Sequence, residues 1–458
     1  MCGTFHYPGA PDFNDGKVFI WPERVTAIGE IFEDGLVMSA IRIEFSGRIG
    51  AGLLPPAFFQ VPGRKVIHTY VSATGTRKDS AREGRWLFLE LLVNGRPDSN
   101  EFKEPAGNYR YIAGGAGWAV ELPIVTAVRQ IETAFNFDGR RIAPFNKVND
   151  DQYIEVVDDF RRGTYADPET GVSINYNLYV PKGYEKKTPG AQKLPLVFFL
   201  HGAGESGYDN RAPVIAYRQA QEYLKKEARE ENPCFLLIPQ CPMTCERQGG
   251  LLDGTVPVDE FGWYTYVRDE KNGTRYTYPS ESLHAAINMI LREIIPACDI
   301  DTAKIYAAGH SMGGGGAVCA LIDRPEVFAA ALSFASAAVF SREMLERLRN
   351  KPVFFTMAED ETYDFIRESM PAMMDQLQEM GVKVYRSTGA GAWDAALRGA
   401  DAEKQAGDTI AGARAAGATM IYVEYLKGSV VPDGHLTHRA SFENASVRHW
   451  LFSQKNLS

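Results

Sequence analysis

The chain has 458 residues and a formal net charge of -9, and its length predicts two or three domains. Its mildly acidic balance argues against nucleic acid or an anionic membrane as the main partner. No apolar run is long enough to span a bilayer, and residues 1–15 lack a signal-peptide pattern, so we expect a cytoplasmic protein or a secreted one whose signal has been removed.

Short alternating runs separated by Gly and Pro fill the first third of the chain. Period-two alternation predicts strands that are buried on one face. No cysteine lies between Cys2 and Cys234, which excludes an antibody-type disulfide. We expect residues 1–150 to form an all-β immunoglobulin-like sandwich, with strands at 17–21, 36–43, 65–71 and 84–93.

From residue 151 onward, apolar strands alternate with helical stretches. This alternation predicts a mostly parallel sheet with helices on both faces, and residues 151–458 are expected to form this catalytic domain. The expected strands are 172–181, 196–200, 234–238, 304–308, 329–334, 353–357 and 419–426, with a further strand at 382–386. The expected helices are 214–228, 281–295, 315–322, 370–380 and 402–416.

The sequence Gly309-His310-Ser311-Met312-Gly313 matches the G-x-S-x-G pattern of a nucleophile elbow. An apolar β run precedes it and a small-residue helical stretch follows it. Small residues two positions before and after the serine let the strand and the helix approach closely. We therefore expect Ser311 to be a nucleophile on a strained strand-to-helix turn.

A serine nucleophile also needs backbone N–H donors for the oxyanion that forms. One is expected at Met312, directly after the nucleophile. The other is expected in the loop that begins with His201-Gly202 after a buried strand, at Ala203, with Gly204 as the alternative. His201 is expected to order this loop and not to act as a base.

The acid and the base should follow the serine in that order along the chain. The loop after strand 353–357 offers Asp360, which we expect to be the acid, with Glu359, Glu361 and Asp364 as alternatives. The loop after strand 419–426 offers His435, which we expect to be the base, with His438 second. His449 lies in a helical pattern beside Trp450 and is expected to pack.

These motifs resemble the polyhydroxybutyrate-depolymerase-like and feruloyl-esterase-like branch of the α/β-hydrolases. The similar segments are 176–181, 198–207, 238–242, 300–316 with 328–330, and the Trp-Leu-Phe-Ser-Gln ending at 450–454. The resemblance implies ester hydrolysis without a metal or organic cofactor. Some members carry an N-terminal immunoglobulin-like domain, and the ending at this distance supports His435 over His438.

Substrate is expected to contact His201, Gly204, His310 and Trp263, and residues 205–217 and 259–278 are expected to wall the pocket. The aromatic residues of the second wall, Phe261, Trp263, Tyr264 and Tyr266, would either stack on substrate or pack the loop.

The six cysteines are too sparse for a disulfide scaffold. We expect buried or free thiols, with one disulfide between Cys241 and Cys245 as the alternative.

The sequence therefore predicts a serine esterase with a Ser311–Asp360–His435 triad. Its substrate would be a small-molecule or polymer-linked ester. A serine peptidase uses the same triad, and an acyltransferase would differ only in the acceptor. The third alternative is a polymer-binding or partner-binding protein with a decayed hydrolase domain. Whether the chain forms a homo-oligomer stays open.

Overall fold

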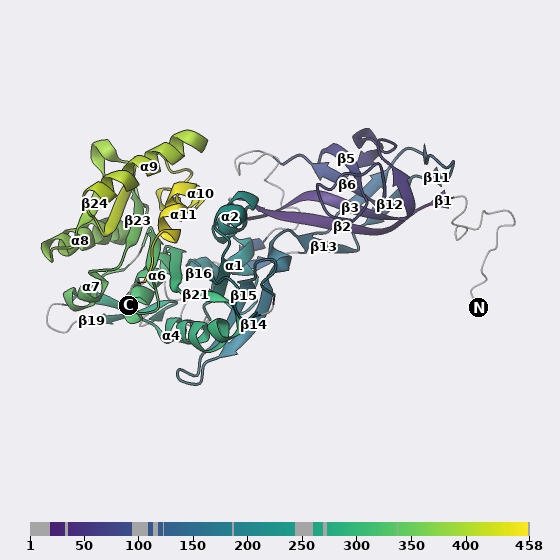
Figure 1. Cartoon of the computed structure of the whole chain (residues 1–458). Coiled ribbons are helices and arrows are strands. Elements are labelled where there is room, and N and C mark those ends of the chain that lie inside the picture. The colour runs from purple at the N-terminus through teal and green to yellow at the C-terminus, as the bar shows by residue number, and fades with distance from the viewer. Residues whose placement is uncertain are drawn as a thin grey trace. The chain divides into compact units, whose positions relative to one another are not determined.

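The computed structural model describes residues 19–32, 35–93, 109–112, 118–121, 123–185, 187–242, 260–268, 273–336 and 338–456. These residues form two compact units (Figure 1). The first unit comprises the described residues up to 93 and residues 123–158. The second comprises the hairpin β7 (Tyr109–Ile112) and β8 (Trp118–Glu121) together with the chain from residue 159 onward. The predicted boundary between residues 150 and 151 stays a prediction.

The first unit is built from β-strands. A five-stranded sheet has the order β13-β2-β3-β6-β5, and a core cluster of Ile28, Ala40 and Phe88 lies on it. Its strands are β2 (Pro22–Phe32), β3 (Gly35–Gly50), β5 (Val66–Ser72), β6 (Glu83–Leu91) and β13 (Asp151–Ile154). Two three-stranded sheets, β12-β9-β4 and β1-β11-β10, complete it. The predicted immunoglobulin-like sandwich is confirmed.

The smaller elements of this unit are short strands and two 3-10 turns. They are β1 (Phe19–Ile20), η1 (Pro56–Phe58), β4 (Phe59–Gln60), β9 (Ala127–Gln130), β10 (Ala134–Phe135), β11 (Arg141–Ile142), β12 (Phe145–Val148) and η3 (Val157–Asp159).

The second unit contains a nine-stranded sheet with the order β14-β15-β17-β16-β21-β22-β23-β25-β24. The first three strands in this order run antiparallel to one another, and the other pairings are parallel. The strands are β14 (Arg161–Ala166), β15 (Ser173–Tyr179), β16 (Leu194–Leu200), β17 (Phe235–Gln240), β21 (Ile300–His310), β22 (Ala330–Phe334), β23 (Val353–Ala358), β24 (Val384–Ser387) and β25 (Met420–Tyr425). The predicted α/β-hydrolase fold is confirmed.

Helices connect these strands and flank the sheet (Figure 1). They are η4 (Ala203–Glu205), α1 (Ala212–Ile215), η5 (Ala220–Leu224), α2 (Lys226–Glu231), α4 (Glu281–Met289), the π-turn η6 (Ile290–Ile294), α5 (Ile295–Ala297), α6 (Met312–Asp323), α7 (Arg342–Leu348), α8 (Asp364–Glu379), η7 (Gly389–Gly391), α9 (Gly399–Ala415), η8 (Gly434–Leu436), α10 (His438–Glu443) and α11 (Ala445–Phe452). A small sheet joins β18 (Glu260–Phe261), β19 (Tyr264–Arg268) and β20 (Arg275–Pro279). Among the described residues, no helix is long and apolar enough to cross a membrane.

Several predicted helices differ from the observed ones, and the stretch 281–295, for example, is divided into α4, η6 and α5. The stretch 214–228 is divided into α1, η5 and α2, so no single helix spans it. The helix predicted at 370–380 begins six residues earlier, at Asp364, and carries Pro371 in its interior. Because proline favours the first turn of a helix, the sequence predicted a start next to Pro371, which is too late.

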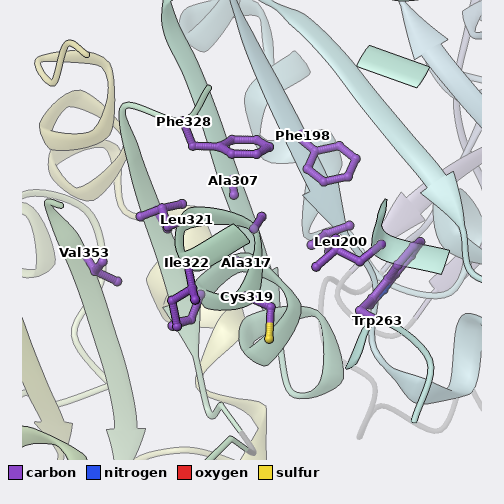
Figure 2. Close-up of a cluster of buried hydrophobic side chains, with 14 of the residues drawn as sticks. Phe198, Leu200, Trp263, Ala307, Ala317, Cys319, Leu321, Ile322, Phe328 and Val353 are labelled. Carbon is purple, nitrogen blue, oxygen red and sulfur yellow. The ribbon is translucent and has the colours of Figure 1, made fainter. Parts of the chain in front are cut away.

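Helix α6 lies against the middle of the sheet, and its apolar side chains form the core there. Figure 2 shows Ala317, Cys319, Leu321 and Ile322 of this helix among side chains of the neighbouring strands. The close packing depends on Gly313, because a Cβ atom on this residue would lie 1.9 Å from the carbonyl oxygen of Leu200. The glycine thereby brings the start of α6 against the end of β16.

Candidate active site

The carboxyl ends of four parallel strands gather the candidate residues. Strands β16, β21, β23 and β25 end at Leu200, His310, Ala358 and Tyr425, and the loops that follow carry every residue expected to do chemistry. In open α/β sheets, ligands bind outside the carboxyl ends of the strands. The topology therefore brings together segments that are more than a hundred residues apart in the sequence.

Ser311 lies on a strained turn between β21 and α6. Its backbone has φ 56° and ψ -121°, a left-handed conformation that non-glycine residues rarely adopt. Its amide donates to the carbonyl oxygen of Phe334 at 2.8 Å. Met312 is the first residue of α6, so its amide is one of those without an acceptor inside the helix. The predicted elbow is therefore present in its expected form.

A chain of two hydrogen bonds joins serine, histidine and a carboxylate. Nε2 of His435 lies 2.9 Å from Oγ of Ser311, and Nδ1 lies 2.8 Å from Oε1 of Glu361. The Glu361 side chain has no exposed surface. In the tautomer whose Nδ1 donates to Glu361, Nε2 is the nitrogen that can accept the hydrogen bond of the serine hydroxyl. The arrangement is that of a catalytic triad.

Asp360, the acid expected from the sequence, does not contact His435 in the structure. Its Oδ2 instead accepts from the amide of Gly428 at 2.8 Å, on the loop after β25. The turn at the end of β23, closed by the Glu361 amide on the carbonyl of Ala358, directs successive side chains differently. The carboxylate that faces the histidine is therefore Glu361, one of the alternatives considered.

The other two alternatives are occupied elsewhere. Glu359 accepts from the amide of Lys427 at 3.0 Å, and Asp364 pairs with Arg367 on the surface of α8. All four acids follow one strand at the same sheet edge, so their sequence positions alone do not separate them.

Two hydrogen bonds hold the backbone of His435, and a third holds the Asp433 side chain that makes one of them. The His435 amide donates to Oδ1 of Asp433 at 2.8 Å, and the hydroxyl of Thr362 donates to the same oxygen. The carbonyl oxygen of His435 accepts from Nε2 of His310 at 2.7 Å. Gly434 must be glycine at this point, because a Cβ atom would lie 2.3 Å from the carbonyl oxygen of Asp360. The histidine loop and the acid loop are thus packed backbone to backbone.

His310 and His438 form a buried pair of rings next to His435. Their ring centroids are 4.1 Å apart, and burial lowers the pKa of both well below the ordinary value. They are therefore uncharged at neutral pH. His310, which was expected to contact substrate, is buried and contacts His435 instead. His449, expected to pack, instead contacts Glu231 through its half-exposed ring.

The candidate oxyanion loop is held by His201. Its Nε2 accepts from the amide of Cys241 at 2.9 Å, and its Nδ1 donates to the carbonyl oxygen of Gly202 at 2.6 Å. Burial lowers the pKa of His201 to about 4, so the neutral ring with these two bonds is the stable form. The residue orders the loop, as predicted, and is too buried to contact substrate. Ala203 and Gly204 follow it in η4 and are half-buried.

Trp263, which was expected to contact substrate, lies inside the protein in this structure. Its side chain is fully buried, and its indole N–H donates to the carbonyl oxygen of His201 at 3.1 Å. Tyr264 beside it is also fully buried. Both aromatics therefore pack the loop, while the Phe261 side chain lies outside the described residues. Trp263 lies next to Leu200 in Figure 2.

Tyr363, which was not among the residues predicted from the sequence, lies beside His435. Its ring centroid lies 4.7 Å from that of His435, with the two planes at 82°. The position of Tyr363, two residues after Glu361, could have indicated its place beside His435 only if Glu361 had already been identified as the acid.

Four described cysteines, Cys234, Cys241, Cys298 and Cys319, are buried free thiols, and Cys2 and Cys245 lie outside the described residues. No group of acidic, histidine and cysteine side chains within the described ranges is placed to hold a metal.

Two family models match the sequence. Residues 24–143 match the family described as Esterase Ig-like N-terminal domain, and residues 168–369 match the family described as Putative esterase. No curated protein matches the sequence.

Solved structures also resemble the chain. A thermostable esterase is 28% identical, with a TM-score of 0.72, and the match covers 94% of this chain and 100% of that one. A ferulic acid esterase is 16% identical, covering 64% and 98%, with a TM-score of 0.35. A dienelactone hydrolase from Anabaena variabilis is 16% identical, covering 64% and 98%, with a TM-score of 0.36.

The sheet, the elbow and the loops at its edge define an α/β-hydrolase. Its sequence carries an esterase Ig-like N-terminal domain followed by an esterase domain, and the chain is a carboxylic ester hydrolase.

Proposed function

We propose that this hydrolase cleaves esters through an acyl-enzyme on Ser311, with a Ser311–His435–Glu361 triad. The observation that carries the proposal is the continuous hydrogen-bonded chain from Oγ of Ser311 through both ring nitrogens of His435 to Glu361. The strained backbone of Ser311 supports it, since such strain is concentrated at functional sites.

In the first step, Oγ of Ser311 attacks the ester carbonyl carbon while Nε2 of His435 takes the hydroxyl proton. The new C–O bond creates a tetrahedral oxyanion, which the amides of Met312 and Ala203 stabilise. The fully buried Glu361 carboxylate holds the imidazole in the correct tautomer and stabilises its positive charge. The bond to the alcohol oxygen then breaks, and His435 gives its proton to that oxygen.

In the second step, His435 takes a proton from water, and the resulting hydroxide attacks the acyl carbon. The bond to Oγ of Ser311 breaks, and His435 returns the proton to the serine. The products are a carboxylic acid and an alcohol. Side chains and water supply every nucleophile and proton in these two reaction steps, so the proposed mechanism needs no metal or organic cofactor. The same two steps cleave small-molecule and polymer-linked esters, and the proposal includes both as substrates.

The experiment compares the wild type with Ser311→Ala on short-chain and hydroxycinnamoyl esters and on matched peptide amides. We expect the wild type to turn over esters faster than amides and Ser311→Ala to lose this turnover. Ser173→Ala, an exposed serine on β15, is the matched control and keeps full activity. Full activity in folded Ser311→Ala would overturn the proposal, and amide turnover without faster ester turnover would make the chain a peptidase.

A further inference from the structure

Two exposed aromatic side chains begin helix α8 beside the proposed triad. Tyr363 is 46% exposed and Phe365 is 54% exposed, and their ring centroids are 5.8 Å apart at an interplanar angle of 52°. Single exposed apolar residues are common on protein surfaces. Here Tyr363 contacts the base of the proposed triad and Phe365 contacts Tyr363, so the exposed pair is placed where it could bind part of the substrate.

The backbone of Tyr363 is fixed to the acid of the triad. Its amide donates to Oε1 of Glu361 at 3.2 Å, the same oxygen that His435 contacts. The carbonyl oxygen of Glu361 accepts from Nη1 of Arg367 on the first turns of α8 at 2.7 Å. The aromatic pair is therefore held at a defined place relative to the imidazole, which is what a binding surface requires.

The chemistry of ester cleavage indicates which half of the substrate would lie near Tyr363 and Phe365. His435 must protonate the leaving alcohol oxygen, so this oxygen lies within hydrogen-bond reach of Nε2. The Tyr363 ring centroid is 4.7 Å from the imidazole centroid, so a group attached to that oxygen would extend close to this ring. The acyl group extends instead from the carbonyl carbon held between Ser311 and the oxyanion loop.

The charges around the pair favour a neutral group. Asp433 and Asp364 flank it, and Asp364 is already paired with Arg367. Partial burial, with the carboxylates of Asp433 and Glu361 nearby, raises the pKa of the Tyr363 phenol. The ring is therefore uncharged at neutral pH, and an anionic alcohol would meet the carboxylate of Asp433.

We propose that Tyr363 and Phe365 form an aromatic platform that binds the alcohol half of the substrate and selects esters of neutral aromatic alcohols. This inference rests on the proposed function, because it assigns the leaving group to the side of His435. The platform acts by stacking and edge-to-face contact and takes no part in the proton transfers.

The test moves one phenyl ring from one side of the ester bond to the other. Wild type, Tyr363→Leu and Phe365→Ala are assayed with 2-phenylethyl acetate, with ethyl 3-phenylpropanoate and with ethyl acetate, whose alcohols have similar leaving ability. We expect each variant to lose about fivefold to tenfold in kcat/KM for 2-phenylethyl acetate. For the two ethyl esters, each variant stays within about twofold. Tyr363→Phe keeps the discrimination, and Leu291→Ala, a half-exposed residue of η6, changes none of the three.

The outcomes separate this inference from the function on which it rests. A wild type that cleaves none of the esters contradicts the proposed function. A wild type that cleaves them, with equal losses on all three in folded Tyr363→Leu, makes Tyr363 a support for His435 and overturns the platform. A loss confined to ethyl 3-phenylpropanoate overturns it too, because the pair would then bind the acyl half.

Discussion

At the scale of residues, two adjacent carboxylates have different surroundings. Glu361 is fully buried against His435, whereas Asp360 binds the backbone of the loop after β25 through Gly428. Only a carboxylate aligned with Nδ1 of the imidazole can stabilise the positive charge that develops during acyl transfer. The two residues should therefore respond differently to the same loss of charge.

We expect Glu361→Gln to lower kcat for ester hydrolysis by between about a hundredfold and ten-thousandfold, because the glutamine amide keeps the shape but not the charge. Asp360→Asn is the matched variant and should retain activity within about fivefold, because its amide oxygen can still accept from Gly428. Steady-state kinetics on one activated ester checks both. An inactive Asp360→Asn beside an active Glu361→Gln would restore Asp360 as the acid.

The sequence was sufficient to predict Ser311 and His435 as neighbours and His201 as the residue that orders the loop. Each follows a buried strand at a position that the fold determines. The acid could not be assigned, because Glu359, Asp360, Glu361 and Asp364 lie on one loop after the same strand. Which of them faces His435 depends on the turn closed on Ala358 and on the backbone contact between Asp360 and Gly434. No short sequence pattern indicates these contacts, because they depend on how the loops pack in the folded protein.

At the scale of elements, the contact between α6 and β16 determines where the serine lies. Helix α6 begins directly after Ser311, and Gly313 lets its first turn touch the end of β16 at Leu200. The pattern of small residues predicted this close approach. It did not predict that Pro371 would lie inside α8, because the six residues before it carry no start signal stronger than proline itself.

We expect Gly313→Ala to lower the free energy of unfolding by about 3 kcal/mol or more, because the new Cβ would meet the Leu200 carbonyl oxygen at 1.9 Å. Gly407→Ala in the interior of α9 is the control. No atom lies within 4 Å of its new Cβ, so it should stabilise the protein by about 0.5–1 kcal/mol. Urea unfolding measures both, and a Gly313→Ala variant as stable as the wild type would contradict the packing described.

At the scale of the whole molecule, three histidines are buried in a neutral state in the hydrolase unit. Burial is the largest cause that lowers the pKa of His201, His310 and His438 from 6.5. The unfolded chain binds a proton at each of these positions below about pH 6.5, whereas the folded chain does not. Their burial therefore costs no stability above that pH, and stability is lost as the pH falls below it.

We expect the free energy of unfolding to fall between pH 6.5 and pH 5, with each histidine contributing up to about 1.4 kcal/mol per pH unit. For His201 the loss continues until the pH reaches its folded pKa of about 4. Urea unfolding at several pH values measures the slope, and His438→Leu should reduce it by the share of one histidine. A stability that stays level or rises over this interval would mean that these rings are charged in the folded protein.

The two-unit organisation followed from the change of periodicity near residue 150. The alternation of apolar and polar residues can be read within each short segment, so the strands of the first unit could be predicted one by one. The position of the boundary could not be predicted in this way, because it depends on tertiary contacts and not on the spacing of apolar residues. The same holds for the hairpin Tyr109–Glu121, which belongs to the second unit.

The most direct test of the account is to trap the acyl-enzyme. The wild type is mixed with a slowly deacylating activated ester, quenched in acid, and analysed by intact and peptide mass spectrometry. We predict one acyl group per chain on Ser311, its absence in Ser311→Ala, and slower formation in Glu361→Gln than in Asp360→Asn. An acyl group on another residue, or rapid ester turnover with unmodified Ser311 at every quench time, would contradict the central claim.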